Sequence, residues 1–213
     1  MIVPSQNAME SDTLDAFNAY QNRDYLKALH IFSKIIGTGT TDVELYFNRG
    51  VCYSKLHQYQ EAIKDYSYVL ELKPKYIPAY INRGIAYYRL NNNILALKDL
   101  NQAVELDVNA KDGYINRAMV FTAMENYQEA LKDLNIVIQI DPLSFEAFYN
   151  LGMVYLTTRI QEECLSLPAL VKISESSFVI PLGFEPRTPL FTELRAFFIS
   201  GFSETKTTIH RRC

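Results

Sequence analysis

The sequence is poor in the residues that build metal sites and disulfide frameworks. It has no tryptophan, three histidines and three cysteines in 213 residues. Cys52, Cys164 and Cys213 lie far apart and form no Cys-x-x-Cys pair, so neither a disulfide framework nor a zinc knuckle is expected. With 21 basic and 24 acidic side chains, the formal charge is only −3. This balance gives no electrostatic footprint for nucleic acid or an anionic membrane. We therefore expect no metal, no nucleic-acid partner and no membrane partner.

Long apolar runs are also missing. No stretch of 18 apolar residues could span a bilayer, and the N-terminal residues Met1-Ile2-Val3-Pro4 lack the basic and apolar regions of a signal peptide. Together with the few cysteines, these absences favour a cytoplasmic location. Association with the nucleus or the cytoskeleton stays open.

The last quarter of the chain lacks residues that are abundant before it. Every tyrosine and asparagine lies at or before Tyr155, and the last aspartate is Asp141. Residues 160–213 nevertheless contain half of the prolines and half of the phenylalanines. A change of composition this sharp indicates two segments of different origin, which meet near Arg159.

What the chain does have is a period of 34 residues, the kind of self-similarity that marks repeat proteins. The small residue Gly50 returns as Gly84, Ala118 and Gly152. Three further registers share the same step: Tyr46, Tyr80, Tyr114 and Phe148; Tyr53, Tyr87, Phe121 and Tyr155; Ala28, Ala62, Ala96 and Ala130. So many coincident registers indicate a repeat protein.

Each unit is predicted to be a pair of helices. In residues 43–76, Gly50 and Tyr53 belong to one stripe with helical spacing, and Ala62 and Tyr66 belong to a second. Pro74 closes the unit, because its ring disfavours helix in the residue before it. A single helix pair cannot bury its own apolar face, so neighbouring units must stack on it.

The order Tyr-x3-Gly-x2-Tyr, then alanine and a closing proline, resembles the tetratricopeptide repeat (TPR). The resemblance implies an all-α fold, a right-handed superhelical solenoid of antiparallel helix pairs. Repeat positions are numbered from the first residue of each unit. The expected units are a degenerate one at 9–42, three regular ones at 43–76, 77–110 and 111–144, the first helix of an incomplete one at 145–159, and a poorly ordered non-repeat tail at 160–213.

The fifth unit is expected to fail halfway. Its second helix should begin near Gln161, but Pro168 falls inside it, where an interior proline costs about 3 kcal/mol. In one interpretation, a short helix within 190–200 docks on the fifth unit and replaces the missing cap. In the other, which we favour, the tail is an alternative C-terminus produced by alternative splicing, and the parent protein continues with more repeats.

A row of asparagines is the main candidate for binding. The resemblance implies that the first helix of each pair lines the concave surface, and position 6 resembles the asparagine ladder of superhelical TPR domains. A side-chain amide offers both a donor and an acceptor, so a row of amides suits a peptide backbone. With apolar neighbours at positions 5 and 9, the predicted peptide-binding groove consists of Phe47, Asn48, Val51, Ile81, Asn82, Ile85, Ile115, Asn116, Met119 and Asn150. In the alternative interpretation, asparagine at position 6 is simply common in such helices.

A second recurrent feature is charged. Arginine stands at position 7 and aspartate at position 23 of the three regular units, and a 16-residue separation would bring them together between antiparallel helices. The predicted structural ion pairs are Arg49 with Asp65, Arg83 with Asp99, and Arg117 with Asp133. The alternative is a basic strip for acidic peptides.

No catalytic constellation is visible. The histidines stand without a serine, cysteine or carboxylate at a recurrent spacing, and there is no glycine-rich phosphate loop. We therefore expect no enzyme activity and no cofactor. The sequence predicts a non-catalytic protein-protein interaction module, an adaptor or scaffold that binds a peptide segment in the concave groove. The alternatives are a substrate-recruiting arm of a larger enzyme or complex, and a truncated isoform with little function of its own.

One known TPR function is expected to be absent. TPR co-chaperones bind the C-terminal carboxylate of heat-shock proteins through a clamp that begins with lysine and asparagine at positions 5 and 9 of one first helix. The corresponding pairs here are Thr13 and Phe17, Phe47 and Val51, and Ile81 and Ile85. None of these residues is lysine or asparagine.

Overall fold

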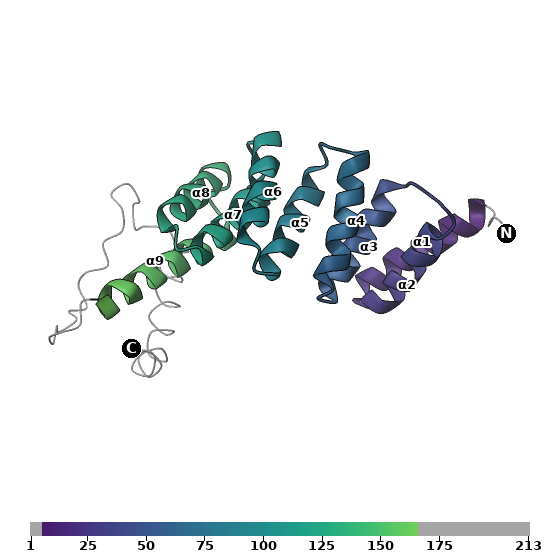
Figure 1. Ribbon diagram of the computed structural model, residues 1–213, viewed down its shortest axis with the longest axis horizontal. Helices are drawn as coiled ribbons and strands as arrows, with labels where there is room; N and C mark the ends of the chain where they lie inside the picture. The colour runs from purple at the N-terminus through teal and green to yellow at the C-terminus, as the bar shows by residue number, and fades with distance from the viewer. Residues whose placement is uncertain (1–5, 166–213) are drawn as a thin grey trace. The chain divides into compact units, whose positions relative to one another are not determined.

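The computed structural model describes the backbone of residues 6–165 and the side chains of residues 11–159. Within that part of the chain all regular structure is helical, which confirms the predicted fold class (Figure 1). The helices are α1 (Gln6–Gln21), α2 (Tyr25–Ile36), α3 (Val43–Lys55), α4 (Tyr59–Leu72), α5 (Ile77–Arg89), α6 (Asn93–Leu106), α7 (Lys111–Ala123), α8 (Tyr127–Ile140) and α9 (Phe145–Leu165). None of these described helices is long and apolar enough to cross a membrane. The chain divides into two units, Met1–Leu156 and Thr157–Cys213, and the helical repeats lie in the first.

A single left-handed residue forms the turn between paired helices. Arg23, His57, Asn91 and Glu125 each have φ near 60°, at intervals of 34 residues. After such a residue the chain reverses, and the next amide bonds back to the helix it has left, as Asn92 N does to Tyr87 O at 2.9 Å. The turn therefore places the second helix antiparallel to the first.

The core lies between the paired helices and between successive pairs. Tyr66 and Leu100 on the second helices are fully buried. Tyr66 lies so close to Gly50 that a Cβ atom built there would be 2.7 Å from its ring, and a Cβ on Gly84 would be 2.9 Å from Leu100. Position 8 must therefore be small for the two helices to approach. Successive pairs then stack, with α4 against α5, α6 against α7, and the first helices α5 and α7 also in contact.

The last helix is longer than expected. α9 continues past residue 159 to Leu165, and no second helix begins at Gln161. Arg159 stands 34 residues after Glu125, yet it stays within α9 and does not adopt the left-handed conformation of the other turns. Without a residue in the left-handed conformation the chain does not turn back, and the helix continues. The proposed tail features, including Pro168 and the helix within 190–200, lie outside the described residues.

Candidate functional site

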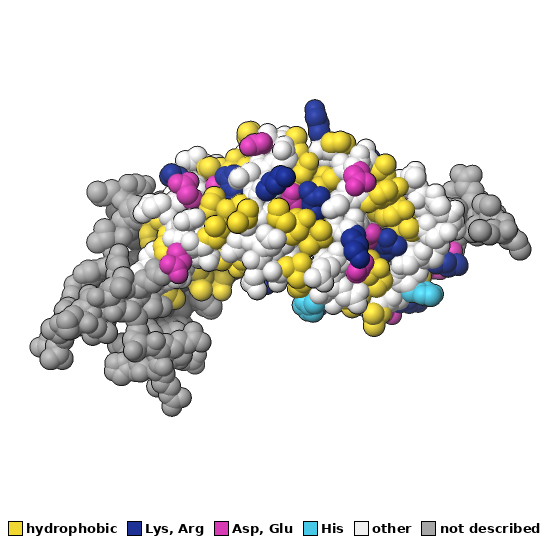
Figure 2. Space-filling view, viewed as in Figure 1, with side chains coloured by type: hydrophobic (Ala, Val, Ile, Leu, Met, Phe, Trp, Pro, Cys, Tyr) yellow, Lys and Arg dark blue, Asp and Glu magenta, His cyan; other side chains and the backbone are white. Residues whose placement is uncertain are grey.

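Charged side chains do not gather by sign on the face shown in Figure 2. Basic and acidic groups lie next to one another among hydrophobic ones. This arrangement agrees with the small net charge of −3. Recognition on this face must therefore come from particular groups and not from a broad charged patch.

The asparagines at position 6 share one geometry. Each lies on a first helix, is partly exposed, and donates through Nδ2 to the backbone carbonyl four residues earlier. The bonds are Asn48 to Glu44 at 2.7 Å, and Asn82 to Pro78, Asn116 to Asp112 and Asn150 to Glu146, each at 2.8 Å. The same side chain thus takes the same orientation on α3, α5, α7 and α9.

This geometry decides which atoms of each amide remain for a ligand. A backbone carbonyl only accepts hydrogen bonds, so the amide must turn its nitrogen toward it. One of the two N–H donors is then used within the helix. The Oδ1 atoms accept no hydrogen bond from any described residue. The row therefore offers two acceptor lone pairs for every remaining donor.

The apolar positions around the asparagines divide into two groups. At position 9, Val51, Ile85 and Met119 are partly exposed, as a groove requires. At position 5, Phe47 packs inside its own repeat: its ring centroid lies 5.8 Å from that of Tyr66 and 5.3 Å from that of Tyr76 in the closing turn.

Ile115, also at position 5, corrects the predicted groove. Its side chain is only 4% exposed, because it packs with Val137, Ile138 and Ala147. Ile115 is therefore part of the core and not of an open groove wall. Ile81, at the same position one unit earlier, is partly buried against the core formed by Leu100 and Val120.

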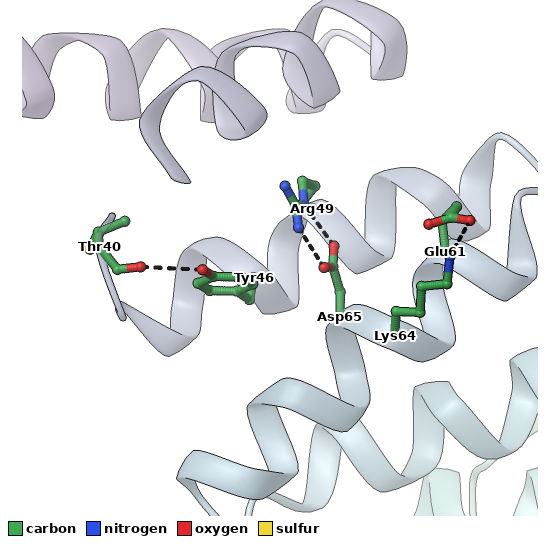
Figure 3. Close-up of polar contacts among 6 residues, drawn as sticks. All are labelled: Thr40, Tyr46, Arg49, Glu61, Lys64 and Asp65. Carbon is green, nitrogen blue, oxygen red and sulfur yellow. Dashed lines mark hydrogen bonds and ion pairs between the residues drawn. The ribbon is translucent and has the colours of Figure 1, made fainter. Parts of the chain in front are cut away.

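The structure brings together all three arginine–aspartate pairs. In the pair shown in Figure 3, Arg49 Nε and Nη2 donate to the two carboxylate oxygens of Asp65 at 2.8 and 2.6 Å. Arg83 binds Asp99 in the same way at 2.7 and 2.8 Å, and Arg117 binds Asp133 at 2.7 Å through both nitrogens. The aspartates are 3–5% exposed. Each pair joins the two helices of one unit.

Two of these arginines also reach the preceding unit. Arg83 Nη1 donates to Ser67 Oγ at 3.0 Å, and Arg117 Nη1 donates to Asn101 Oδ1 at 2.9 Å. Ser67 and Asn101 both stand at repeat position 25, where the sequence has a serine or asparagine in four units. Sequence reasoning missed this contact, although the 34-residue step of the polar residue was a visible signal.

Aromatic rings lie close to the guanidinium groups, and burial changes the pKa of one paired carboxylate. The Arg49 guanidinium carbon lies 5.4 Å from the Tyr46 ring centroid and 5.8 Å from that of Tyr53. Burial raises the pKa of Asp65, although the hydrogen bonds and charge of Arg49 act to lower it. The hydrogen bond to Asp65 in turn raises the pKa of Arg49. With their charges already compensated, the arginines are poorly suited to form a basic strip.

Acidic side chains stand at repeat position 2, near the start of α3, α7 and α9, and one of them contacts the closing turn of its own unit. Glu44 accepts a hydrogen bond from Tyr76 Oη at 2.9 Å, and its carboxylate lies 3.7 Å from Lys73 Nζ. Asp112 and Glu146, at the same repeat position, form no ion pair with any residue the structure describes. They are therefore acidic groups without an ion pair next to Asn116 and Asn150, although the neighbouring Lys111 interacts electrostatically with Asp112.

Metal-binding and nucleophilic groups are scarce among the described side chains. These include no group of three or more His, Cys, Asp or Glu arranged to hold a metal ion. Cys52 is fully buried, and burial raises the pKa of its thiol to about 11. This thiol is therefore unsuited to act as a nucleophile near neutral pH.

Comparison with known proteins identifies the repeat. The tetratricopeptide repeat family matches residues 43–76 and again residues 77–108. The heat shock protein sti1 homolog of Schizosaccharomyces pombe is 38% identical over 56 residues, which are 26% of this chain and 10% of that protein. The chain thus spans about a tenth of the length of this curated relative.

Solved structures give the same result for the fold. The first TPR of Spaghetti (RPAP3), bound to the HSP90 peptide SRMEEVD, is 29% identical with a TM-score of 0.52, and the match covers 55% of this chain and 93% of that one. The MamA protein matches with a TM-score of 0.64 and 19% identity, over 76% of this chain and 88% of its own. The described helices form a TPR solenoid, in which residues 43–76 and 77–108 match the tetratricopeptide repeat family.

Proposed function

We propose that this chain is a non-catalytic protein-interaction module that holds a peptide segment along the first helices of its repeats. The observation that carries the proposal is the row of asparagines, which repeats one side-chain geometry on four successive first helices. The RPAP3 domain, 29% identical to this chain, supports it because that protein is bound to a peptide.

A peptide backbone suits this surface in two ways. Its N–H groups can donate to the Oδ1 atoms, one amide for each repeat that it crosses. Its side chains can contact Val51, Ile85 and Met119, which lie near the asparagines and are partly exposed. Backbone contacts supply affinity, while contacts with side chains supply selectivity.

The partner we propose is not an acidic C-terminal tail of the heat-shock type. Position 5 holds Phe47, whose ring is committed to packing against Tyr66 and Tyr76, and position 9 holds Val51. Neither side chain can donate hydrogen bonds to a terminal carboxylate. These positions therefore offer no clamp for a peptide such as the SRMEEVD that is bound to RPAP3.

The test is a selection of random 12-residue peptides displayed against the full chain. Peptides that are selected should bind at least about fivefold more weakly to the Asn82→Ala, Asn116→Ala variant, since two amide contacts of about 0.5–1.5 kcal/mol each are lost. The matched control is Gln60→Ala, Gln128→Ala, which removes two exposed amides from the second helices α4 and α8. Equal loss of binding in both variants would contradict the groove, as would no effect of either.

The short match to the sti1 homolog favours a second function for the same surface. In that relative the aligned 56 residues are part of a longer protein, and by analogy we propose that the repeats here also serve as a recruiting arm within a larger assembly. Failure to select any peptide would contradict both functions and support a truncated isoform without binding activity.

A further inference from the structure

We propose that the surface formed by Asn82, Asp112, Asn116, Glu146 and Asn150 selects an extended segment that carries arginine or lysine side chains. This inference rests on the proposed function, because it names the chemistry of the peptide that the first helices hold.

The first step is the orientation of the amides. Asn116 and Asn150 each donate one side-chain N–H to a backbone carbonyl of their own helix, at 2.8 Å. The acceptor lone pairs of these amides therefore outnumber their remaining donors. A ligand with many donors and no acceptors complements such a row. Arginine offers five N–H donors and lysine three, and neither accepts.

The second step is the charge beside the amides. The carbonyls that bind Asn116 and Asn150 belong to Asp112 and Glu146, whose side chains are exposed. Residues four apart lie on the same helix face, so each carboxylate neighbours its amide. Asn82 differs in having Pro78 at that position, so no carboxylate stands beside this amide on its own helix.

The third step is that nearby cations are already paired. Lys111 Nζ lies 2.8 Å from the Asp141 carboxylate, and Arg117 is bound to buried Asp133. Lys111 also interacts electrostatically with Asp112, but its ion pair is with Asp141. Glu44 is the exposed acidic residue at the same repeat position on α3. It lies near Lys73 and accepts a hydrogen bond from the hydroxyl group of Tyr76. Of the acidic residues at repeat position 2, only Asp112 and Glu146 therefore stand without an ion pair in the described part of the chain.

The geometry also sets a spacing. The first helices α5 and α7 are in direct contact, and packed helix axes lie about 8–10 Å apart. A peptide in the extended polyproline II conformation advances about 3.1 Å per residue with three residues per turn, so every third side chain faces the repeats and meets a successive unit. The aliphatic stem of each basic side chain can pack on Met119, whose side chain adapts to irregular partners. A motif of the form Arg-x-x-Arg fits this surface.

The experiment measures fluorescence anisotropy of the full chain with three labelled peptides. The first has arginine at every third position of a serine–alanine host, the second has glutamate in those places, and the third is SRMEEVD. We expect the arginine peptide to bind at least about tenfold more tightly than either acidic one, with the preference reduced as salt rises. The Asp112→Asn, Glu146→Gln variant should bind it about fivefold more weakly.

The control variant, Glu61→Gln, Glu129→Gln, removes the same charge from the second helices, where each glutamate pairs with a lysine. An equal loss in both variants would overturn the inference, because only net charge would then matter. Equal binding of arginine and glutamate peptides, both weakened by Asn116→Ala, would overturn it and leave the proposed function intact. No binding of any peptide, together with a failed display selection, would overturn the proposed function itself.

Discussion

Arg83 on α5 reaches back to Ser67 on α4, where its Nη1 atom donates to the serine hydroxyl at 3.0 Å. The remaining guanidinium nitrogens of this residue bind Asp99 on α6. One side chain therefore connects three helices from two repeats. Stability of such an array depends on the interfaces between units as well as on each unit, and Arg83 contributes to both.

Removal of the carboxylate should leave this arginine without its main partner. We expect Asp99→Ala to lower the free energy of unfolding by about 3 kcal/mol, because the remaining charge is largely buried. Glu129→Ala, which breaks an exposed pair with Lys132, should cost less than about 1 kcal/mol. Urea titration followed by circular dichroism measures both. An equally small effect of the two variants would show that the buried pair contributes little.

The turn residues offer a gain in stability. Glu125 has φ of 61°, a conformation that costs side chains other than glycine about 1–2 kcal/mol. We expect Glu125→Gly to raise the unfolding free energy by about 0.5 kcal/mol, since extra freedom of the unfolded chain offsets part of the relief. Asn91→Gly should change little, because asparagine tolerates this conformation. A loss of stability in Glu125→Gly would mean that its side chain makes a contact worth more than the strain.

Position 8 should respond differently in two units. In Gly50→Ala, the new methyl group meets the buried Tyr66 ring, and we expect a net loss of about 1 kcal/mol despite the better helix propensity of alanine. In Gly84→Ala the neighbour is Leu100, and the chain already combines Ala118 with Leu134 one unit later. That variant should be close to neutral. Thermal unfolding distinguishes the two, and equal melting temperatures would contradict the steric argument.

The buried thiol gives a signature in alkaline solution. The pKa of Cys52 is about 11 in the folded chain against its ordinary 9.0. The folded state therefore holds the proton more tightly, so this contribution to stability is complete below pH 9 and is lost as the pH rises toward 11. Wild type should lose more stability over that window than Cys52→Ala. Parallel pH profiles would contradict the assigned burial.

The ion pairs illustrate what could be predicted from the sequence. A 34-residue period fixes which residues share a repeat position, so the partners Arg83 and Asp99 follow from their 16-residue separation. The burial of Ile115 did not follow, because it depends on Ala147 of the next unit. The continuation of α9 also escaped prediction, since a turn depends on one residue entering the left-handed region, which Arg159 does not do.

The 34-residue period also makes part of the candidate site predictable. Periodicity identifies the asparagine row, but it does not say which end of each amide faces outward. That depends on the carbonyl four residues earlier, as for Asn116 and Asp112. The coupling of Arg117 to Asn101 likewise needed the stacking of units to be seen.

The most direct test of the account is an NMR titration of the 15N-labelled chain with the arginine peptide. Side-chain amide signals of Asn82, Asn116 and Asn150 can be assigned from single substitutions to glutamine. The account predicts that these three signals shift together as peptide is added, while those of Gln60 and Gln128 on the second helices stay in place. Shifts confined to the second helices would contradict it, because the peptide would then bind away from the asparagine row.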